Sequence, residues 1–342
     1  MNKEITLHNS SEFQNSTIID RFGRVFNYLR IAINERCNLR CIYCMPEEGI
    51  LFQEKDRLLD KNEICKIIKV MSELGVSKIR FTGGEPLLRK DLLDLIQYTY
   101  QQTDISSIHL TTNGVLLSKH INQLEKAGLN GINISLDTLN RVKFKKITRR
   151  EELENVLEGL DLAICSGIKS IKVNMVVMKG FNNDEITEFV ELPKNNDITV
   201  RFIELMPFDS HQIWKTGKFY RADHIVKDLR SHYKTLSPVT GSSTEYYIFK
   251  IKEYAGRVAV IPSYTRSLCS ACNRIRVTAD GNLLNCLYSR SETNMRDAIR
   301  NGMKNEGLKN LIVGSMQKKL KDGLIAQNQG NDSRESMTQI GG

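Results

Sequence analysis

The sequence has no run of 18 consecutive apolar residues, the length that a membrane-spanning helix requires. Residues 1–16 are polar and lack the apolar segment of a secretory signal peptide. No short repeat is visible along the chain either, so nothing indicates a repeat architecture. These absences favour a cytoplasmic protein with no membrane partner.

Size and charge set wide limits on the class of protein. A chain of 342 residues exceeds the size at which a single core usually stops growing, so we expect one large domain with a substantial extension. Hydrophobic residues make up 40% of the chain, which is enough for a core. The 49 Lys and Arg outnumber the 40 Asp and Glu, and the net charge of +9 favours an anionic partner such as a polyphosphate, a membrane surface or nucleic acid.

Six of the eight cysteines fall into two groups of three, at 37, 41 and 44 and at 269, 272 and 286. In a long chain without a secretory leader, such grouping indicates metal binding rather than disulfides. Thiolates hold zinc or iron–sulfur clusters. A structural zinc site needs four ligands, and no histidine near the first group completes the set. A four-iron cluster on three cysteines would leave one iron open to a cofactor, with a zinc ribbon or an inert cluster as the alternative.

Strand and helix patterns alternate through the first two thirds of the chain, which predicts a parallel α/β sheet. The predicted strands cover residues 28–33, 78–82, 107–111, 131–135, 170–177 and 199–204, and the predicted helices cover 61–74, 89–102, 119–127, 151–166 and 183–191. Five of these strands alternate between an apolar face and a polar, partly cationic face. Helices would cover the apolar face and the polar face would line a cavity, which favours a partial, open (β/α)6 barrel.

The predicted barrel spans residues 19–206, after a polar lead-in at 1–18 and before a C-terminal α+β extension at 207–342 that carries the second cysteine group. Strand-like runs occur in the extension at 246–251 and 257–261, and residues 326–338 read as a polar, mobile end. The unusual segments follow the carboxyl ends of strands: the first cysteines, Gly-Gly-Glu-Pro at 83–86, Thr-Asn-Gly at 112–114 and Ser-Leu-Asp at 135–137. That edge of such a sheet is where sites form.

The spacing of Cys37, Cys41 and Cys44 resembles the signature of the radical S-adenosylmethionine (SAM) superfamily. With Gly-Gly-Glu-Pro, the second cysteine group and the terminal Gly341-Gly342, the chain resembles the GTP 3′,8-cyclase family, known as molybdenum cofactor biosynthesis protein A, from about residue 20 to the end apart from 207–245. The family usually carries serine where this chain has Ala32.

The resemblance implies two [4Fe–4S] clusters, SAM on the open iron of the first, and GTP held near the second, with the Gly-Gly tail reaching into the active site. The implied metal ligands are Cys37, Cys41, Cys44, Cys269, Cys272 and Cys286. The implied SAM contacts are Tyr43, Gly84, Ser135 and Met206. The implied GTP contacts are Arg30, Arg80, Thr111, Lys172, Arg274, Ile275 and Arg276, of which Arg274 and Arg276 would also assist the reaction.

Charge supports the GTP assignment independently. The alternating strands direct several cations into the expected cavity, and a nucleoside triphosphate carries about four negative charges that arginine forks bind well. Five cations would converge there: Arg30, Arg80, Lys172, Arg274 and Arg276, with Lys78 and Arg201 as further candidates.

The implied reaction is a lyase reaction, the conversion of GTP to (8S)-3′,8-cyclo-7,8-dihydroguanosine 5′-triphosphate, an early step of molybdenum cofactor biosynthesis. Electron transfer to SAM would give a 5′-deoxyadenosyl radical that takes hydrogen from C3′ of GTP, after which C3′ attacks C8. The implied partners are an electron donor such as flavodoxin or ferredoxin, a downstream cyclic pyranopterin monophosphate synthase and a possible second copy in a homodimer. Nucleic acid is not expected.

Two other classes of protein are alternatives to this interpretation. A peptide-modifying radical SAM maturase also carries an auxiliary cluster, but usually within a longer cysteine-rich C-terminal region. A non-catalytic metalloprotein that binds nucleic acid would explain the charge of +9. It would leave Gly-Gly-Glu-Pro and the alternating strand faces unexplained.

Overall fold

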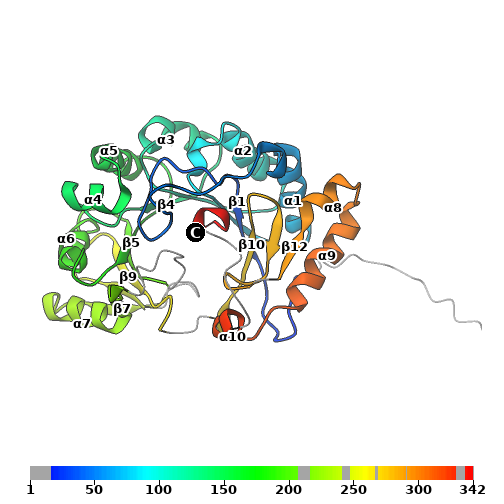
Figure 1. Ribbon diagram of the computed structural model, residues 1–342. Coiled ribbons are helices and arrows are strands. Elements are labelled where there is room, and N and C mark those ends of the chain that lie inside the picture. Colours follow the sequence, from blue (N-terminus) through cyan, green and yellow to red (C-terminus); the bar gives the residue numbers. More distant parts are fainter. Residues whose placement is uncertain are drawn as a thin grey trace, which may run out of the picture.

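The computed structural model describes residues 17–206, 216–240, 247–265, 269–289, 291–328 and 336–341. Within them, one sheet of twelve strands runs in the order β12-β11-β10-β1-β2-β3-β4-β5-β6-β9-β8-β7. Figure 1 shows this sheet curved around an open interior, with helices on its outer face. The predicted partial (β/α)6 barrel is thereby confirmed.

Six parallel strands form the middle of the sheet. They are β1 (Tyr28–Ala32), β2 (Lys78–Thr82), β3 (Ser107–Thr112), β4 (Gly131–Ser135), β5 (Ser170–Val177) and β6 (Thr199–Glu204). The intervening helices are α1 (Lys61–Glu73), α2 (Leu92–Gln102), α3 (Leu117–Lys126), α4 (Arg141–Thr148), α5 (Leu153–Ile164) and α6 (Ile186–Glu191). The sequence predicted all of these except α4, in which four of eight residues are Lys or Arg and the buried residues are Phe144, Ile147 and Thr148.

Helix α1 illustrates how the sequence fixes the outer layer. Asp60 and Glu63 form a capping box at its start, each side chain accepting a hydrogen bond from the other residue's backbone N–H. Gly75, with φ of +81°, follows its end. The helix buries Ile64, Ile67, Ile68 and Met71, and the outward strand residues Leu29, Ile31, Ile79 and Phe81 are equally buried. The polar strand faces are therefore left for the interior.

The C-terminal extension continues the same sheet at both edges. Strand β10 (Arg274–Val277) pairs in parallel with β1, and β9 (Arg257–Ile261) pairs in parallel with β6. Antiparallel strands lie outside them: β11 (Asn282–Leu284) and β12 (Glu292–Asn294) beyond β10, and β8 (Tyr247–Lys250) and β7 (Ser237–Val239) beyond β9. The extension also holds α7 (Ala222–His232), α8 (Met295–Arg300), α9 (Asn305–Gln317) and α10 (Gly323–Asn328). Strands from both sides of residue 206 thus belong to one sheet.

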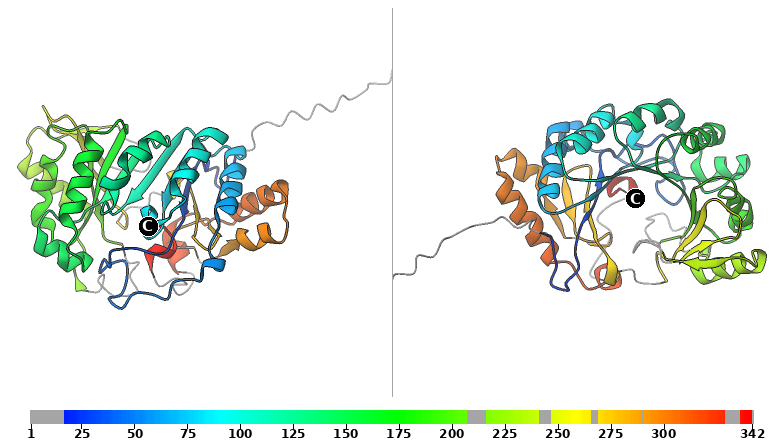
Figure 2. Two further views of the ribbon diagram at one scale, coloured as in Figure 1. Left: turned by 90° about the horizontal axis from the view of Figure 1, so that it is seen from above. Right: turned by 180° about the vertical axis from the view of Figure 1, so that it is seen from behind.

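The end of the chain folds into the barrel opening, where all views of Figures 1 and 2 place the C-terminus. Ser336 caps the short turn Met337–Gln339, and its hydroxyl donates to the Cys44 carbonyl oxygen at 2.7 Å. The prediction of a mobile end over 326–338 is therefore wrong for 326–328, which lie in α10, and for 336–338. Residues 329–335 and Gly342 lie outside the described residues, as do 1–16 of the lead-in and 207–215 at the start of the extension.

No helix in the described parts of the chain is long and apolar enough to cross a membrane.

Candidate active site

A cavity of about 400 Å³ lies inside the barrel. The predicted site residues that line it are Arg30, Cys37, Cys41, Tyr43, Cys44, Arg80, Gly84, Thr111, Ser135, Lys172, Met206, Arg274 and Arg276. Ile275 is placed elsewhere: its side chain is fully buried on the opposite face of β10, because neighbouring strand residues point to opposite sides. A contact from Ile275 to a ligand in this cavity would have to come from its backbone.

The first cysteine loop is held by the end of α4. The N–H groups of Arg40 and Ile42 donate to the carbonyl oxygens of Thr148 and Ile147, each at 2.9 Å. Arg149 follows with a left-handed backbone (φ of 58°), and its guanidinium donates to the carbonyl oxygens of Arg40 and Met45. The helix that the sequence did not predict therefore supports the loop that carries the first three thiols.

The first three thiols are half-buried, line the cavity and lie near one another. Burial raises the pKa of Cys41, and the neighbouring Cys44 adds to the effect; burial and Cys37 raise the pKa of Cys44 to about 12. The N–H of Leu39 donates to Cys37 Sγ at 3.4 Å, and the Asn113 amide lies 3.6 Å from the same sulfur. Thiolates that are largely shielded from water need a positive centre to be stable, and an iron–sulfur cluster supplies one, so this donor set fits a cluster.

The Gly-Gly-Glu-Pro segment packs on the backbone just before those cysteines. A Cβ at Gly83 would lie 2.2 Å from the Asn34 carbonyl oxygen, and one at Gly84 would lie 2.3 Å from that of Arg36. The sequence suggested glycine for close approach to a ligand; the structure adds that backbone 34–36 occupies the space where both side chains would be. Only glycine fits here, and both glycines also line the cavity.

Two carboxylates that were not predicted as site residues organise the rim. Glu85 is buried and accepts from the Thr112 hydroxyl and the Asn113 N–H, both at 2.8 Å; burial raises its pKa to about 7 although these bonds oppose the rise. Asp137 accepts from the Tyr43 hydroxyl at 2.7 Å, and burial raises its pKa to about 6. Glu85 joins the ends of β2 and β3, and Asp137 fixes Tyr43. In the sequence, Glu85 and Asp137 both lie shortly after the end of a predicted strand, and this position is the signal that could have identified them as site residues.

Cations gather on the inner face of β1, β2 and β10. Arg30 of β1 stands opposite Arg276 of β10 on one side and opposite Arg80 of β2 on the other, and Arg80 stands opposite His109 of β3. Burial and the neighbouring cations, Arg80 foremost, lower the pKa of His109 to about 2, so this imidazole is neutral. Lys78 and Arg201 line the same cavity, as the sequence suggested.

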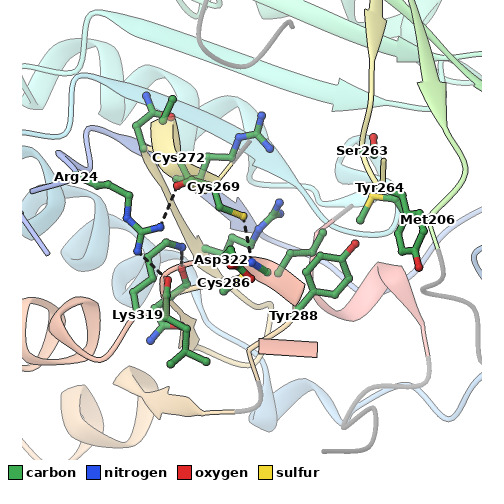
Figure 3. Close-up of a pocket in the computed structure, with 18 of the residues that line it drawn as sticks. Arg24, Met206, Ser263, Tyr264, Cys269, Cys272, Cys286, Tyr288, Lys319 and Asp322 are labelled. Carbon is green, nitrogen blue, oxygen red and sulfur yellow. Dashed lines mark hydrogen bonds between the residues drawn. The ribbon is translucent and has the colours of Figure 1, made fainter. Parts of the chain in front are cut away.

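A second pocket of about 160 Å³ holds Cys269, Cys272 and Cys286 (Figure 3). It adjoins the main cavity, since Met206, Arg274 and Arg276 line both. The Gly323 N–H donates to Cys269 Sγ at 3.1 Å. Burial alone would raise the pKa of Cys272, but the Lys319 ammonium and the two arginines outweigh it and lower that pKa.

Arg24 links this pocket to the N-terminal segment, a role that the sequence did not indicate. Its guanidinium donates to the carbonyl oxygens of Cys269, at 2.9 Å, and Leu320, at 2.8 Å, and pairs with the buried Asp20 carboxylate at 2.6 Å. The first of these bonds is drawn in Figure 3. One buried arginine thus holds the backbone of Cys269 and also the segment at Leu320, which leads to the Gly323 N–H that donates to Cys269 Sγ.

Within the described residues, no three Cys, His, Asp or Glu side chains are arranged to hold a single metal ion. The ligands of one zinc ion all lie about 2.3 Å or less from the same centre. The cysteines of an iron–sulfur cluster instead bind different irons and stand farther apart. Each cysteine group gathers three thiols at one pocket, and three thiols are the donor set that a four-iron cluster with one open iron takes.

The C-terminal turn enters the main cavity beside β1. A Cβ on Gly341 would lie 2.2 Å from Thr82 Oγ1 and 3.1 Å from Ala32 Cβ. The Arg276 guanidinium donates to the Gly341 carbonyl oxygen at 3.4 Å. The alanine at position 32, where the resembled family usually has serine, thus lies next to the tail.

Comparisons with known proteins agree with this geometry. Residues 31–192 match the radical SAM superfamily, and residues 198–324 match the family Molybdenum Cofactor Synthesis C. GTP 3′,8-cyclase of Chlorobaculum tepidum is 43% identical over 325 residues, 95% of this chain and 97% of that protein. Molybdenum cofactor biosynthesis protein 1 of Dictyostelium discoideum is 43% identical over 306 residues, 88% of this chain and 48% of that longer protein. The crystal structure of Streptococcus suis SuiB, 16% identical, aligns with a TM-score of 0.60 over 89% of this chain and 73% of that chain, which shows a shared fold.

Proposed function

The chain belongs to the GTP 3′,8-cyclase family of radical SAM enzymes, and on this premise we propose that it converts GTP to (8S)-3′,8-cyclo-7,8-dihydroguanosine 5′-triphosphate, an early step of molybdenum cofactor biosynthesis. The enzyme is a lyase that uses two [4Fe–4S] clusters and SAM. One observation carries the proposal: the cationic cavity at the first group of three cysteines adjoins the pocket of the second group, and Met206, Arg274 and Arg276 line both.

Cys37, Cys41 and Cys44 would hold the cluster that binds SAM, and Tyr43, Gly84, Ser135 and Met206 would contact SAM. When bound, these groups supply the radical that starts the reaction. The chain's own contribution is position: Asp137 orients the Tyr43 hydroxyl, and the packing of Gly83 and Gly84 on residues 34–36 fixes the loop before Cys37.

Cys269, Cys272 and Cys286 would hold the second cluster, with the guanine of GTP beside it. The triphosphate would then lie against Arg30, Arg80, Lys172 and the neighbouring Lys78 and Arg201, where charge-assisted hydrogen bonds are strongest. Thr111 accepts from Arg80 at 3.4 Å and offers a neutral contact. Arg274 and Arg276 line both pockets, which supports a role at the reacting ribose and base.

The proposed partners follow from the same chemistry. An acidic electron donor such as flavodoxin or ferredoxin suits a chain with a net charge of +9, and a cyclic pyranopterin monophosphate synthase would take the product. A homodimer stays a prediction. The cytoplasm is the proposed location, since all eight cysteines are free thiols that a reducing compartment preserves. Several of the cations that raise the net charge line the interior cavity, which disfavours nucleic acid as their partner.

The test is an anaerobic assay of the reconstituted protein with SAM, GTP and a reductant. The proposal expects one 3′,8-cyclised GTP product together with cleaved SAM. A peptide-modifying maturase would cleave SAM but leave GTP unconsumed, and that result would reject the cyclase assignment. An Arg80→Ala variant with full iron content should lose GTP binding by about 1–3 kcal/mol and keep SAM binding.

A further inference from the structure

Tyr28 lies in the middle of the cations that line the cavity, although the proposed mechanism gives it no role. It is 5% exposed and lines the cavity. The Arg80 Nε donates to its hydroxyl oxygen at 2.6 Å, and the Lys78 ammonium lies 5.1 Å from its ring centre. In the sheet it stands opposite Lys78 of β2 on one side and Arg274 of β10 on the other.

The charged groups around Tyr28 come from every strand packed against it. They are Arg30 from its own strand, Lys78 and Arg80 from β2, and Arg274 and Arg276 from β10, with the neutral His109 beyond on β3. Of the described residues that line the cavity, the carboxylates are Asp137 and Glu204. Asp137 accepts from Tyr43, and Glu204 accepts from the N–H groups of Ala222 and Thr265. Cys37, Cys41 and Cys44 also line the cavity but would be engaged by the first cluster, so Tyr28 is the acid that lies directly against the cations of β2 and β10.

Electrostatics agree with this placement. Burial on its own would raise the pKa of Tyr28, but Arg80, Arg30 and Arg274 outweigh burial and bring the pKa down to about 7. The relation is mutual, because Tyr28 opposes the fall in the Arg30 pKa that burial and Arg276 cause. Near neutral pH the phenolate form is thus substantially populated before an anionic ligand enters.

We propose that Tyr28 is the counter-ion of the cationic cavity before GTP binds, and that GTP binding returns one proton from solvent to the Tyr28 hydroxyl. The triphosphate brings about four negative charges to the same cations, so the phenolate is no longer stabilised and becomes repelled. Once protonated, the oxygen still accepts from Arg80 Nε, and its O–H gains the ability to donate to a phosphate oxygen. Tyr28 is then a positioning residue for Arg80 whose protonation is linked to substrate binding. This inference rests on GTP being the substrate.

The test is calorimetric titration of the iron-loaded protein with GTP, under anaerobic conditions, in buffers of different ionisation enthalpy. At about pH 8, where GTP has lost its last phosphate proton and Tyr28 is mostly ionised, wild type should take up close to one proton per GTP bound. Tyr28→Phe should take up close to none. Tyr100→Phe, which removes a hydroxyl from a side chain that is 61% exposed, should match wild type.

The pH dependence gives a second, independent readout. Because the phenolate must be protonated for GTP to bind, wild-type affinity should fall by up to tenfold per pH unit between about pH 7.5 and 8.5. The affinity of Tyr28→Phe should stay nearly level over that range. Iron content and SAM binding must match wild type in each variant. If Tyr28→Phe does not fold, the readout is instead the near-ultraviolet tyrosinate absorption of wild type, which should decrease when GTP binds.

Uptake of the same number of protons in Tyr28→Phe, or GTP binding by wild type without uptake and without loss of tyrosinate absorption, would overturn the inference and leave the proposed function intact. Absence of GTP binding by iron-loaded wild type would instead reject the proposed function, and this inference with it.

Discussion

At the scale of residues, the site is built from side chains whose partners come from distant parts of the chain. Alternation along the strands was enough to predict which cations face inward, because a strand residue can point only to one side or the other. It could not predict Glu85 or Asp137 as organising groups. Glu85 binds Thr112 and Asn113 at the end of β3, and Asp137 binds Tyr43. These partners are close in space but distant in the sequence.

Arg274 and Arg276 allow binding and chemistry to be separated. If they act on the reacting ribose and base, Arg274→Ala and Arg276→Ala should lower the turnover of GTP far more than its affinity, since a contact made in the transition state leaves ground-state binding largely unchanged. SAM should still be cleaved without cyclised product. The measurement is equilibrium GTP binding beside product formation in variants of equal iron content.

The same pair of measurements shows when this assignment fails. A fall in turnover that only follows the loss of affinity would make the two arginines anchors for phosphate or base. Unchanged binding and turnover would mean that the inner face of β10 does not meet the substrate.

At the scale of elements, the regular strands of the barrel were predictable and its supports were not. The bounds of β2, β4, β5, β6 and β9 agree with the predicted ranges, because each strand begins at a glycine, serine, threonine or charged residue that marks its start. Helix α4 was not predicted, because half of its residues are lysine or arginine and the few apolar residues that it buries do not form a clear helical pattern. The pairing of β10 with β1 could not be predicted, because more than two hundred residues separate the two strands and no local sequence pattern indicates which strand will lie beside another in parallel.

The buried Arg24 is predicted to hold the second cysteine group in place. Arg24→Ala should lower the free energy of unfolding by about 3–5 kcal/mol, because it leaves the Asp20 carboxylate buried without its cation and frees the carbonyls of Cys269 and Leu320. Iron bound by the second cysteine group should fall, while iron bound by the first stays. Urea unfolding and iron content measure the two effects.

The neighbouring Arg21 offers a matched control, since it is exposed and its guanidinium only stacks on Phe22 at 4.9 Å. Arg21→Ala should change the free energy of unfolding by no more than about 0.5 kcal/mol. Equal effects of the two substitutions, or loss of iron from both cysteine groups alike, would show that Arg24 supports the fold in general and not the second pocket.

At the scale of the whole molecule, the fold brings three remote regions to one cavity. Residues 37–44 come from the loop after β1, residues 269–286 surround β10, and residues 336–341 return to β1 from the end of the chain. Because β10 extends the sheet directly beside β1, the pocket of the second cysteine group adjoins the cationic cavity of the first. We therefore propose that one nucleotide lies between the two clusters.

The most direct test removes one cysteine group at a time and measures iron, SAM cleavage and GTP product in the same samples. Anaerobically reconstituted wild type should hold about eight irons, four on each group. Replacing Cys37, Cys41 and Cys44 by Ala should remove half of the iron and abolish SAM cleavage. Replacing Cys269, Cys272 and Cys286 by Ala should remove the other half, retain SAM cleavage and abolish the cyclised product. Zinc instead of iron on the second group, or cyclised GTP formed without that group, would contradict the account.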